Sequence, residues 1–404
     1  MQKAAICYTE RRRPQNFTGS YSMKKIGSVL LLLAMALSLA ACGAKGPDKT
    51  GGEAPKEEAS WFPEKATVTQ ADGTQFDLIV CRLEGDTLTA RYSWPDGRDN
   101  GFDPYYDFSF TLKDGFVSRR TMESAYRADE VERVESEIAY DAAAGKILLQ
   151  STASDGSAVP GPESFAFTFD DQGRVASLTV HSKGYSGNEV DTLYTYAYGA
   201  ESYTVSSDLE NRGTGDGEIS YREHTVWTIA NDHSSMEEVT DIEPVTAALT
   251  IEVKEGGEYV EKEVARIRRV SNAQGYLTEE TTTLADGTTG RDGRQGVGAG
   301  EFDADGRIVS FAYTKIDGTI GREAKYSYDE NGNMSRFELT MDGETQMVAI
   351  SWMKIPEGLA RAGELFQGGS AFILSEMIEE GVTGISEDMG LFLLTRRSGL
   401  FPEK

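Results

Sequence analysis

A short motif recurs along this chain and constrains its fold more than any other feature. It consists of an aromatic residue, an aspartate, a short polar insert, a glycine and an apolar residue. Clear copies occupy residues 169–175, 302–308 and 328–334, and looser copies occupy 140–147 and 271–277. The aspartate can accept a hydrogen bond from the backbone N–H two residues on, while the glycine supplies the positive φ that closes a hairpin. Each copy therefore predicts a turn between two antiparallel strands.

The segments between these turns have the two-residue period of half-buried strands. From Thr192 to Tyr198, for example, tyrosines occupy alternate positions and so face one side of the expected strand. Further Asp-Gly or Gly-Gly signals begin at residues 72, 114, 155, 256, 286, 317 and 342, and helical periodicity is almost absent from 66 to 350. We therefore expect a mainly β fold, an antiparallel multi-hairpin meander over residues 63–350. It forms either one extended sheet or a two-lobed sandwich divided near 206–218.

The aromatic-Asp turn resembles the tyrosine-aspartate (YD) repeats of the RHS and wall-associated protein families. In those families tandem hairpins form large β shells or stalks at cell surfaces, so the resemblance implies a structural β body. The copies in this chain are few and irregularly spaced, 26 residues apart from Phe302 to Tyr328 and 29 from Tyr140 to Phe169. Because the repeat is structural in those families, the resemblance implies no functional residue.

The most apolar part of the chain, residues 26–41, contains no charged residue and follows Lys24 and Lys25. Its 16 residues are fewer than the roughly 20 that a membrane-spanning helix needs. A basic segment followed by an apolar one is typical of a secretory signal peptide. Residues 39–42, Leu-Ala-Ala-Cys, resemble the lipobox of bacterial lipoproteins, in which the cysteine is acylated and becomes the first mature residue. We therefore expect a signal peptide at 23–41, lipidation of Cys42, and a location on the extracytoplasmic face of a bacterial membrane.

The flanking segments complete this N-terminal organisation. Residues 1–22 precede Met23, the natural start of such a signal, and are expected to be an extension from a misplaced start codon. Residues 42–62 lack apolar periodicity up to Trp61, so they predict a flexible tether. Residues 1–41 hold six of the 40 Lys and Arg and one of the 66 Asp and Glu, which leaves 34 basic and 65 acidic side chains and a net charge of −31. This charge repels nucleic acid, so nucleic acid is excluded as a partner. We expect the protein to be attached to the membrane only through the lipid on Cys42.

The loop region from Trp94 to Asp107 is the best candidate for a binding site. Several carboxylates there could converge on one calcium ion, and aromatic rings beside acids are typical of sugar-binding surfaces. The calcium candidates are Asp96, Asp99, Asp103 and Asp107, and the glycan candidates are Trp94, Tyr105, Tyr106, Asp99 and Asp103. The alternatives are a solvated loop for the aspartates and strand core for the aromatic rings. No cofactor other than calcium is expected.

Enzyme signatures are weak in this sequence. Only three histidines exist, and His224 and His233 lie nine residues apart rather than at the helical spacing of a zinc protease. The glycine-rich run at 296–300 lies among turn residues rather than between a strand and a helix, so it does not predict a dinucleotide site. Cys81 lies in an apolar strand and is expected to be a small buried residue. Many carboxylates are present, and no pair is singled out.

The character of the chain changes at about residue 351. Residues 357–367 and 370–380 have helical spacing and 391–394 form an apolar run, so we expect a helical C-terminal cap over 351–404 with a final strand. Three functions fit these observations. They are a surface binding or adhesion lipoprotein for glycans or proteins, an envelope structural or assembly factor that binds a cell-envelope protein through the helices, and a carboxylate-dependent hydrolase.

Overall fold

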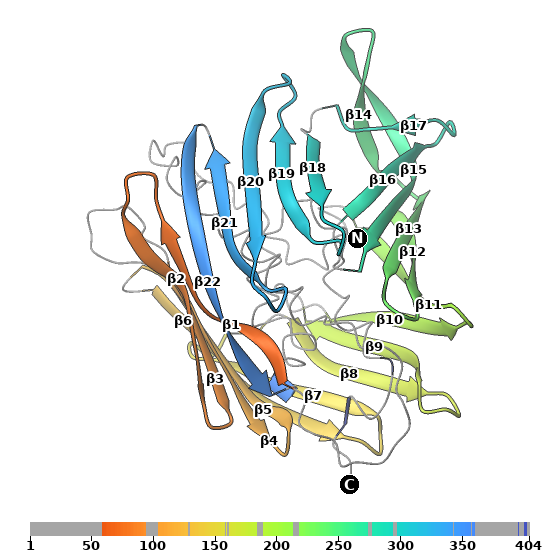
Figure 1. Ribbon diagram of the computed structural model, residues 1–404. Coiled ribbons are helices and arrows are strands. Elements are labelled where there is room, and N and C mark those ends of the chain that lie inside the picture. Colours follow the sequence, from red (N-terminus) through yellow and green to blue (C-terminus); the bar gives the residue numbers. More distant parts are fainter. Residues whose placement is uncertain are drawn as a thin grey trace.

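The fold is an antiparallel β-sheet of 22 strands (Figure 1). The computed structural model describes residues 59–93, 104–127, 130–157, 159, 161–183, 189–212, 218–273, 277–293, 297–341, 343–356, 358–359, 395 and 400–401. The predicted mainly β, antiparallel meander is confirmed. Among the described residues no helix is long and apolar enough to cross a membrane.

The strands follow one another along the chain with short turns between most of them. They are β1 (Ala59–Thr69), β2 (Gln75–Glu84), β3 (Thr87–Ser93), β4 (Tyr105–Lys113), β5 (Phe116–Arg127), β6 (Glu130–Asp141), β7 (Lys146–Ala153), β8 (Gly161–Phe169), β9 (Val175–Lys183), β10 (Glu189–Tyr198), β11 (Ser202–Arg212), β12 (Ile219–Ala230), β13 (Ser235–Pro244), β14 (Thr250–Glu255), β15 (Glu258–Asn272), β16 (Leu277–Leu284), β17 (Thr289–Gly290), β18 (Val297–Phe302), β19 (Ile308–Thr314), β20 (Ile320–Tyr328), β21 (Met334–Met341) and β22 (Glu344–Pro356).

Neighbours in sequence are also neighbours in the sheet. From β1 to β13 each strand pairs with the next. β13 then pairs with β15, whose first half forms a separate hairpin with β14. β15 continues to β16 and β17, while β18 to β22 form a second run. β1 pairs with β22 and joins the two runs. Figure 1 shows the sheet curving round, so that the β16–β17 end faces the β18 end.

The aromatic-Asp motifs form the predicted hairpin turns, and their three clear copies have the same geometry. In each, the aspartate Oδ1 accepts hydrogen bonds of 2.8–3.0 Å from the backbone N–H groups two and four residues on. These aspartates are Asp170, Asp303 and Asp329. The glycine that closes each turn has a φ of 72°, 76° or 83°, a region that L side chains rarely adopt.

Each of these turns is also fastened by an aromatic residue from a later strand. The Tyr198 hydroxyl donates to the Val175 carbonyl at 2.9 Å, and the Tyr328 hydroxyl donates to the Ile308 carbonyl at 2.7 Å. At the third turn the Trp352 indole N–H donates to the Met334 carbonyl at 2.8 Å. This bond satisfies a backbone carbonyl at the start of the second strand of each hairpin.

One face of the curved sheet carries a continuous apolar core. Buried side chains come from β1 to β13 and from β19 to β22, and the largest fully buried ones include Tyr92, Trp227 and Phe337. The tyrosines of β10 follow the expected alternation, since Tyr194 and Tyr196 are buried and Tyr198 packs against the core at its edge. The period of two thus positions one set of side chains inside and the other outside.

The strands extend past several expected boundaries. β1 begins at Ala59, inside the segment expected to be a tether, and β22 runs on to Pro356, because these two ends pair with each other. The ladder between β11 and β12 pairs Ser206 to Arg212 with Val226 to Ile219, so the described strands on both sides of 213–217 belong to one sheet. The division into two lobes near 206–218 stays a prediction.

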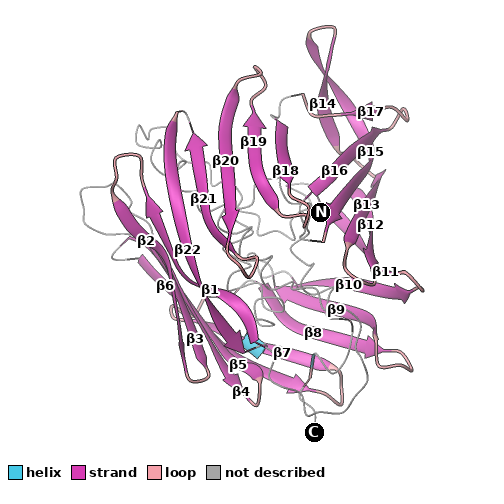
Figure 2. Cartoon of the chain, in the orientation of Figure 1, coloured by secondary structure: helices cyan, strands magenta, loops and turns pink. Residues whose placement is uncertain are grey.

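The C-terminal segment contacts the sheet at every point where it is described. A short helical piece contains Gly358 and Leu359 (Figure 2). The Thr395 carbonyl accepts a 2.9 Å hydrogen bond from the backbone N–H of Val175, and Phe401 is buried against β8. The helices expected over most of 357–380, the final strand at 391–394, and the N-terminal segments including Cys42 lie outside the described residues.

Candidate ligand-binding site

Tyr105 and Tyr106, two of the expected glycan-binding residues, lie on opposite faces of β4. Tyr105 is on the outer face, where its hydroxyl donates a 2.7 Å hydrogen bond to Glu123 and the Arg91 guanidinium lies 4.4 Å from the ring centroid. Tyr106 packs against the core, with its ring 6.3 Å from that of Phe108. The two rings therefore do not form one platform. Trp94, Asp99 and Asp103 lie outside the described residues, so their part of the glycan hypothesis stays a prediction.

Asp107, the only described member of the calcium candidates, is paired with a cation. Its two carboxylate oxygens accept hydrogen bonds of 2.9 and 2.8 Å from Arg91. Desolvation raises the pKa of Asp107, and the bonds from Arg91 oppose that effect. Asp96 lies outside the described residues, as do Asp99 and Asp103. Within the part of the chain that the structure describes, no group of three or more His, Cys, Asp or Glu side chains could hold a metal ion.

Two buried carboxylates face the core from β12 and β13, but they are far apart. Glu223 lies opposite Ile242, and Glu238 lies opposite Trp227. The two positions differ by four residues along the strands, which at about 3.3 Å per residue gives roughly 13 Å. The acid pairs of glycosidases are about 5 to 9.5 Å apart. This geometry gives no support to a hydrolase built on Glu223 and Glu238.

Cys81 has the properties of a core residue. Its side chain is buried in β2, and burial raises the pKa of the Cys81 thiol to about 12. A thiol with such a pKa carries almost no thiolate at neutral pH, and the thiolate is the nucleophilic form. Cys81 is therefore a poor candidate for a nucleophile.

A cleft of about 550 Å³ lies where the two ends of the sheet meet. Its lining residues come from the β14 strand, from β17 and the residues that follow it, from the start of β18, and from the turn after β19. They are Val253, Lys254, Thr289, Gly290, Arg291, Asp292, Gly293, Val297, Lys315 and Ile316. We refer to this feature as the seam cleft, and to the line between β16–β17 and β18 as the seam.

The loop after β17 forms one wall of the seam cleft because it leaves the sheet to pack on the β14–β15 hairpin. The Gly293 N–H donates a 2.6 Å hydrogen bond to the Glu252 carbonyl. A Cβ atom at Gly293 would lie 3.1 Å from both the Glu252 oxygen and the Tyr259 ring, so this close approach favours glycine. Residues 291 and 292 are held at the cleft as a result.

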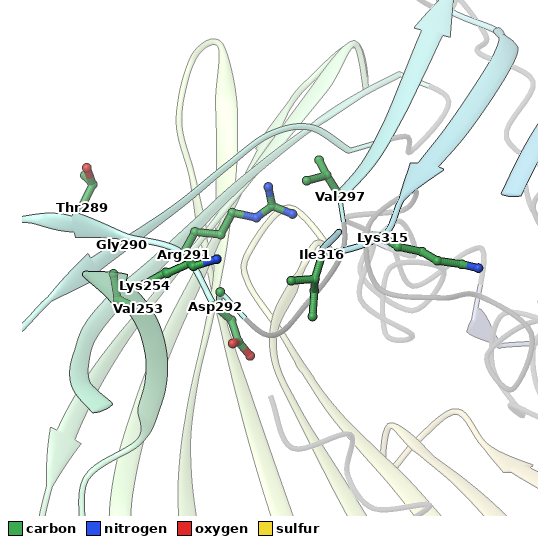
Figure 3. A pocket seen from close by; sticks show the side chains of 10 residues that line it. Val253, Lys254, Thr289, Gly290, Arg291, Asp292, Val297, Lys315 and Ile316 are labelled. Carbon is green, nitrogen blue, oxygen red and sulfur yellow. The ribbon is translucent and has the colours of Figure 1, made fainter. Parts of the chain in front are cut away.

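The seam cleft carries more positive than negative charge. Lys254 and Arg291 lie on one wall and Lys315 on the rim of the other, with Asp292 as the only acid among the lining residues. Figure 3 shows the Arg291 side chain reaching toward Val297, while the Lys315 side chain points away from it. The sign of this local charge is opposite to that of the whole chain, whose net charge is −26.

Apolar side chains flank these cations. Val297 and Ile316 are 40% and 52% exposed, although large apolar side chains on a soluble surface are usually better covered. Val253 adds a third apolar residue to the lining. Exposed apolar side chains beside several cations suit a ligand with an anionic group and an apolar part.

No motif in the sequence points to this cleft. Its cations belong to three separate hairpins at residues 254, 291 and 315, and only the curvature of the sheet brings them together. The one local feature is the glycine-rich run at 296–300, whose residue types predict turns. The described part of that run belongs to strand β18, and no dinucleotide-binding helix follows it.

Comparisons with known proteins give no family for this chain. No protein-family model matches it, and no curated protein matches it. One similar solved structure is a porin-like protein from Bacteroides uniformis ATCC 8492, with 11% sequence identity and a TM-score of 0.26, covering 72% of this chain and 98% of the other.

Proposed function

We propose that this chain is a lipid-anchored binding protein on the extracytoplasmic face of a bacterial membrane, and that its seam cleft receives an anionic group of the ligand. The proposal has two parts with separate support. The basic segment, the apolar segment and Cys42, in that order, support the anchor. The geometry of the seam cleft supports the binding role.

The single observation that carries the binding role is the position of Lys254 and Arg291 on one wall of a cleft. The long-range field of a chain with net charge −26 repels anions. Exposed charges are, however, screened beyond about 8 Å at physiological ionic strength. A small anion inside the cleft therefore interacts mainly with the nearest side chains, which are predominantly cations.

The binding test compares charge reversal in the cleft with charge reversal elsewhere. The cleft variant carries Lys254→Glu and Arg291→Glu, and the matched control carries Lys146→Glu and Lys325→Glu, two exposed strand lysines outside the cleft. The probes are trigalacturonate and triglutamate, which differ in backbone but share three side-chain carboxylates. Saturation-transfer NMR on the full chain in detergent measures their binding.

We expect the unaltered chain to bind at least one probe, and more weakly at higher salt. Loss of two charge-assisted contacts should weaken binding about tenfold or more in the cleft variant, whereas the control should differ by less than about twofold. Equal effects of the two variants, or binding of neither probe, would contradict the binding role of the cleft.

The anchor is tested in cells. Metabolic labelling with an alkyne fatty acid should mark the unaltered chain, and Cys42→Ser should remove the label and leave an uncleaved precursor. A label that survives in Cys42→Ser would contradict the assignment of Cys42 as the lipidated residue.

A further inference from the structure

The two ends of the sheet leave strand edges along the seam. β18 pairs with β19 from Val297 to Phe302, and no described residue pairs with its other edge. On the opposite side, β16 pairs with β17 only at Thr282 and Thr283. β17 is two residues long because the chain then turns away to the β14–β15 hairpin. Most of β16 and all of β18 therefore face the seam with no strand between them in the described part of the chain.

The seam is held together at one end and borders the cleft at the other. The Asn272 side-chain amide, at the end of β15, donates a 2.9 Å hydrogen bond to the Gly306 carbonyl in the β18–β19 turn. The other end lies at Val297, which lines the cleft. The seam is therefore closed by a direct contact at the Gly306 end and borders the cleft at the Val297 end.

The exposed edge of β18 lacks two common kinds of protection against pairing, and its one charged residue and its register irregularity lie at the Glu301–Phe302 end, away from the cleft. Edge strands commonly carry lysine or proline that discourages the addition of another strand. β18 has the sequence Val-Gly-Ala-Gly-Glu-Phe, with neither residue. In antiparallel pairing alternate residues direct their N–H and C=O groups away from the partner, so about three residues of β18 offer hydrogen-bonding groups to the seam.

We propose that the ligand of the seam cleft is an extended polypeptide segment that adds to the edge of β18 as an antiparallel strand. This inference rests on the proposed function and names the chemical class of its ligand. A strand antiparallel to β18 has its C-terminal end at Val297, beside Lys254 and Arg291. The structure therefore assigns a carboxylate, either the chain terminus or an acidic side chain near it, to the cleft. A segment of about six residues matches the length of β18, roughly 20 Å.

A second copy of this chain fits the seam less well than a single segment does. Direct pairing of two β18 strands would bring two whole sheets to the same edge. The β14–β15 hairpin lies on the opposite wall of the cleft, and the Asn272–Gly306 bond joins the two sides at the far end. A single added strand lies about 4.8 Å from β18 and brings no second sheet to the edge.

The first experiment selects ligands from a library of random heptapeptides with free C-termini, using the full chain in detergent as bait. The bait for counter-selection is the Lys254→Glu, Arg291→Glu variant. We expect enriched peptides that share a free carboxylate or an acidic residue at the C-terminal end. No enrichment over the charge-reversed bait would overturn the inference. If trigalacturonate still binds in that case, the anion-binding role of the cleft stands and only the peptide ligand is rejected.

The second experiment tests strand pairing on the most enriched peptide. Two peptides are compared, one N-methylated at two odd-numbered residues and one at two even-numbered residues, so that each lacks two backbone donors. One of the two should bind about thirtyfold more weakly than the unmodified peptide, and the other should be affected much less. Equal small effects in the two peptides would show that only the carboxylate is recognised, which overturns strand addition. A dimer of the chain by light scattering that the peptide does not dissociate would assign the edge to a second copy and would also overturn it.

The third experiment alters the edge of the protein. Because neighbouring residues of β18 alternate in direction, one of Gly298→Pro and Ala299→Pro removes a seam-facing N–H, and the other removes an N–H of the β18–β19 ladder. We expect the variant that keeps the original melting temperature to lose the peptide. Retention of peptide binding in that variant contradicts the inference. If neither variant folds, the N-methyl series on the unaltered chain decides.

Discussion

At the scale of single residues, two tyrosines of β20 show how the surroundings of a hydroxyl group decide its contribution to stability. Tyr328 lies at the end of the strand and donates its hydroxyl hydrogen to the Ile308 carbonyl at 2.7 Å. Tyr326, two residues earlier, is 7% exposed, and its hydroxyl has no hydrogen-bond partner among the described residues. A buried polar group without a partner is unfavourable, whereas the bond of Tyr328 satisfies a backbone acceptor.

Removing each hydroxyl should therefore have a different effect on stability. We expect Tyr328→Phe to lower the free energy of unfolding by about 1 kcal/mol, the usual net value of one hydrogen bond. Tyr326→Phe should leave it unchanged or raise it by up to about 1 kcal/mol, because no bond is lost and a buried hydroxyl is removed. Urea unfolding followed by tyrosine and tryptophan fluorescence measures both. A larger loss in Tyr326→Phe than in Tyr328→Phe would contradict this assignment.

At the scale of elements, the sequence predicted the features that depend on neighbouring residues. The turns at Asp170, Asp303 and Asp329 were predictable because the hydrogen bonds of these aspartates join residues at most four apart. The aromatic side chains that fasten them were not, because Tyr198 lies 24 residues beyond Arg174, although the two are stacked at 4.2 Å. Such contacts depend on the lengths of the intervening strands.

At the candidate sites, too, distance in the sequence does not predict which side chains lie together. Tyr105 and Tyr106 are adjacent in sequence, yet the two-residue period of a strand sends them to opposite faces. Lys254, Arg291 and Lys315 are distant in sequence, and the curvature of the sheet places them around one cleft. Composition and spacing could not reveal this group, since it depends on the register of strands β14 to β19.

The described residues at the C-terminal end, Leu400 and Phe401, belong to the core. Phe401 is 2% exposed, and its ring meets those of Phe167 and Phe169 edge to face at 6.0 and 6.2 Å. We expect Phe401→Ala to lower the free energy of unfolding by about 3 kcal/mol or more, as for other large-to-small changes in a core. The matched control is Leu193→Ala on the outer face of β10, which should cost less than about 0.5 kcal/mol. Urea unfolding measures both, and similar losses would contradict a core role for Phe401.

At the scale of the whole molecule, two kinds of charge affect stability in different pH ranges. The net negative charge lowers stability toward neutral pH, and the turn aspartates contribute stability that is lost at acidic pH. The net charge falls from −26 at pH 7 to zero near the isoelectric point of about 4.6, which relieves self-repulsion. The turn aspartates respond at lower pH. Hydrogen bonds from the backbone N–H groups of Thr74 and Ser157 lower the pKa values of Asp72 and Asp155, and the Thr288 hydroxyl and N–H lower the pKa of Asp286.

The sign of the turn contribution follows from these depressed pKa values. A carboxylate whose pKa is lower in the folded chain stabilises it fully above its ordinary value near 3.8, and that stabilisation is lost as the pH falls through the folded-state value. We therefore expect the free energy of unfolding to be highest between about pH 4 and 5.5, and to fall both toward pH 7 and below pH 4. Urea unfolding at each pH, at protein concentrations low enough to avoid precipitation, measures the profile.

A variant with Asp72→Asn, Asp155→Asn and Asp286→Asn separates the two causes. The asparagine oxygen can still accept the turn hydrogen bonds, but it does not titrate in this range. The loss of stability below pH 4 should therefore be shallower in the variant, while the decline from pH 5.5 to 7 should persist, because it comes from the remaining acidic side chains. An unchanged slope below pH 4 would mean that the turn carboxylates do not cause the acid sensitivity. The loss would then have to come from the growing positive charge of the whole chain.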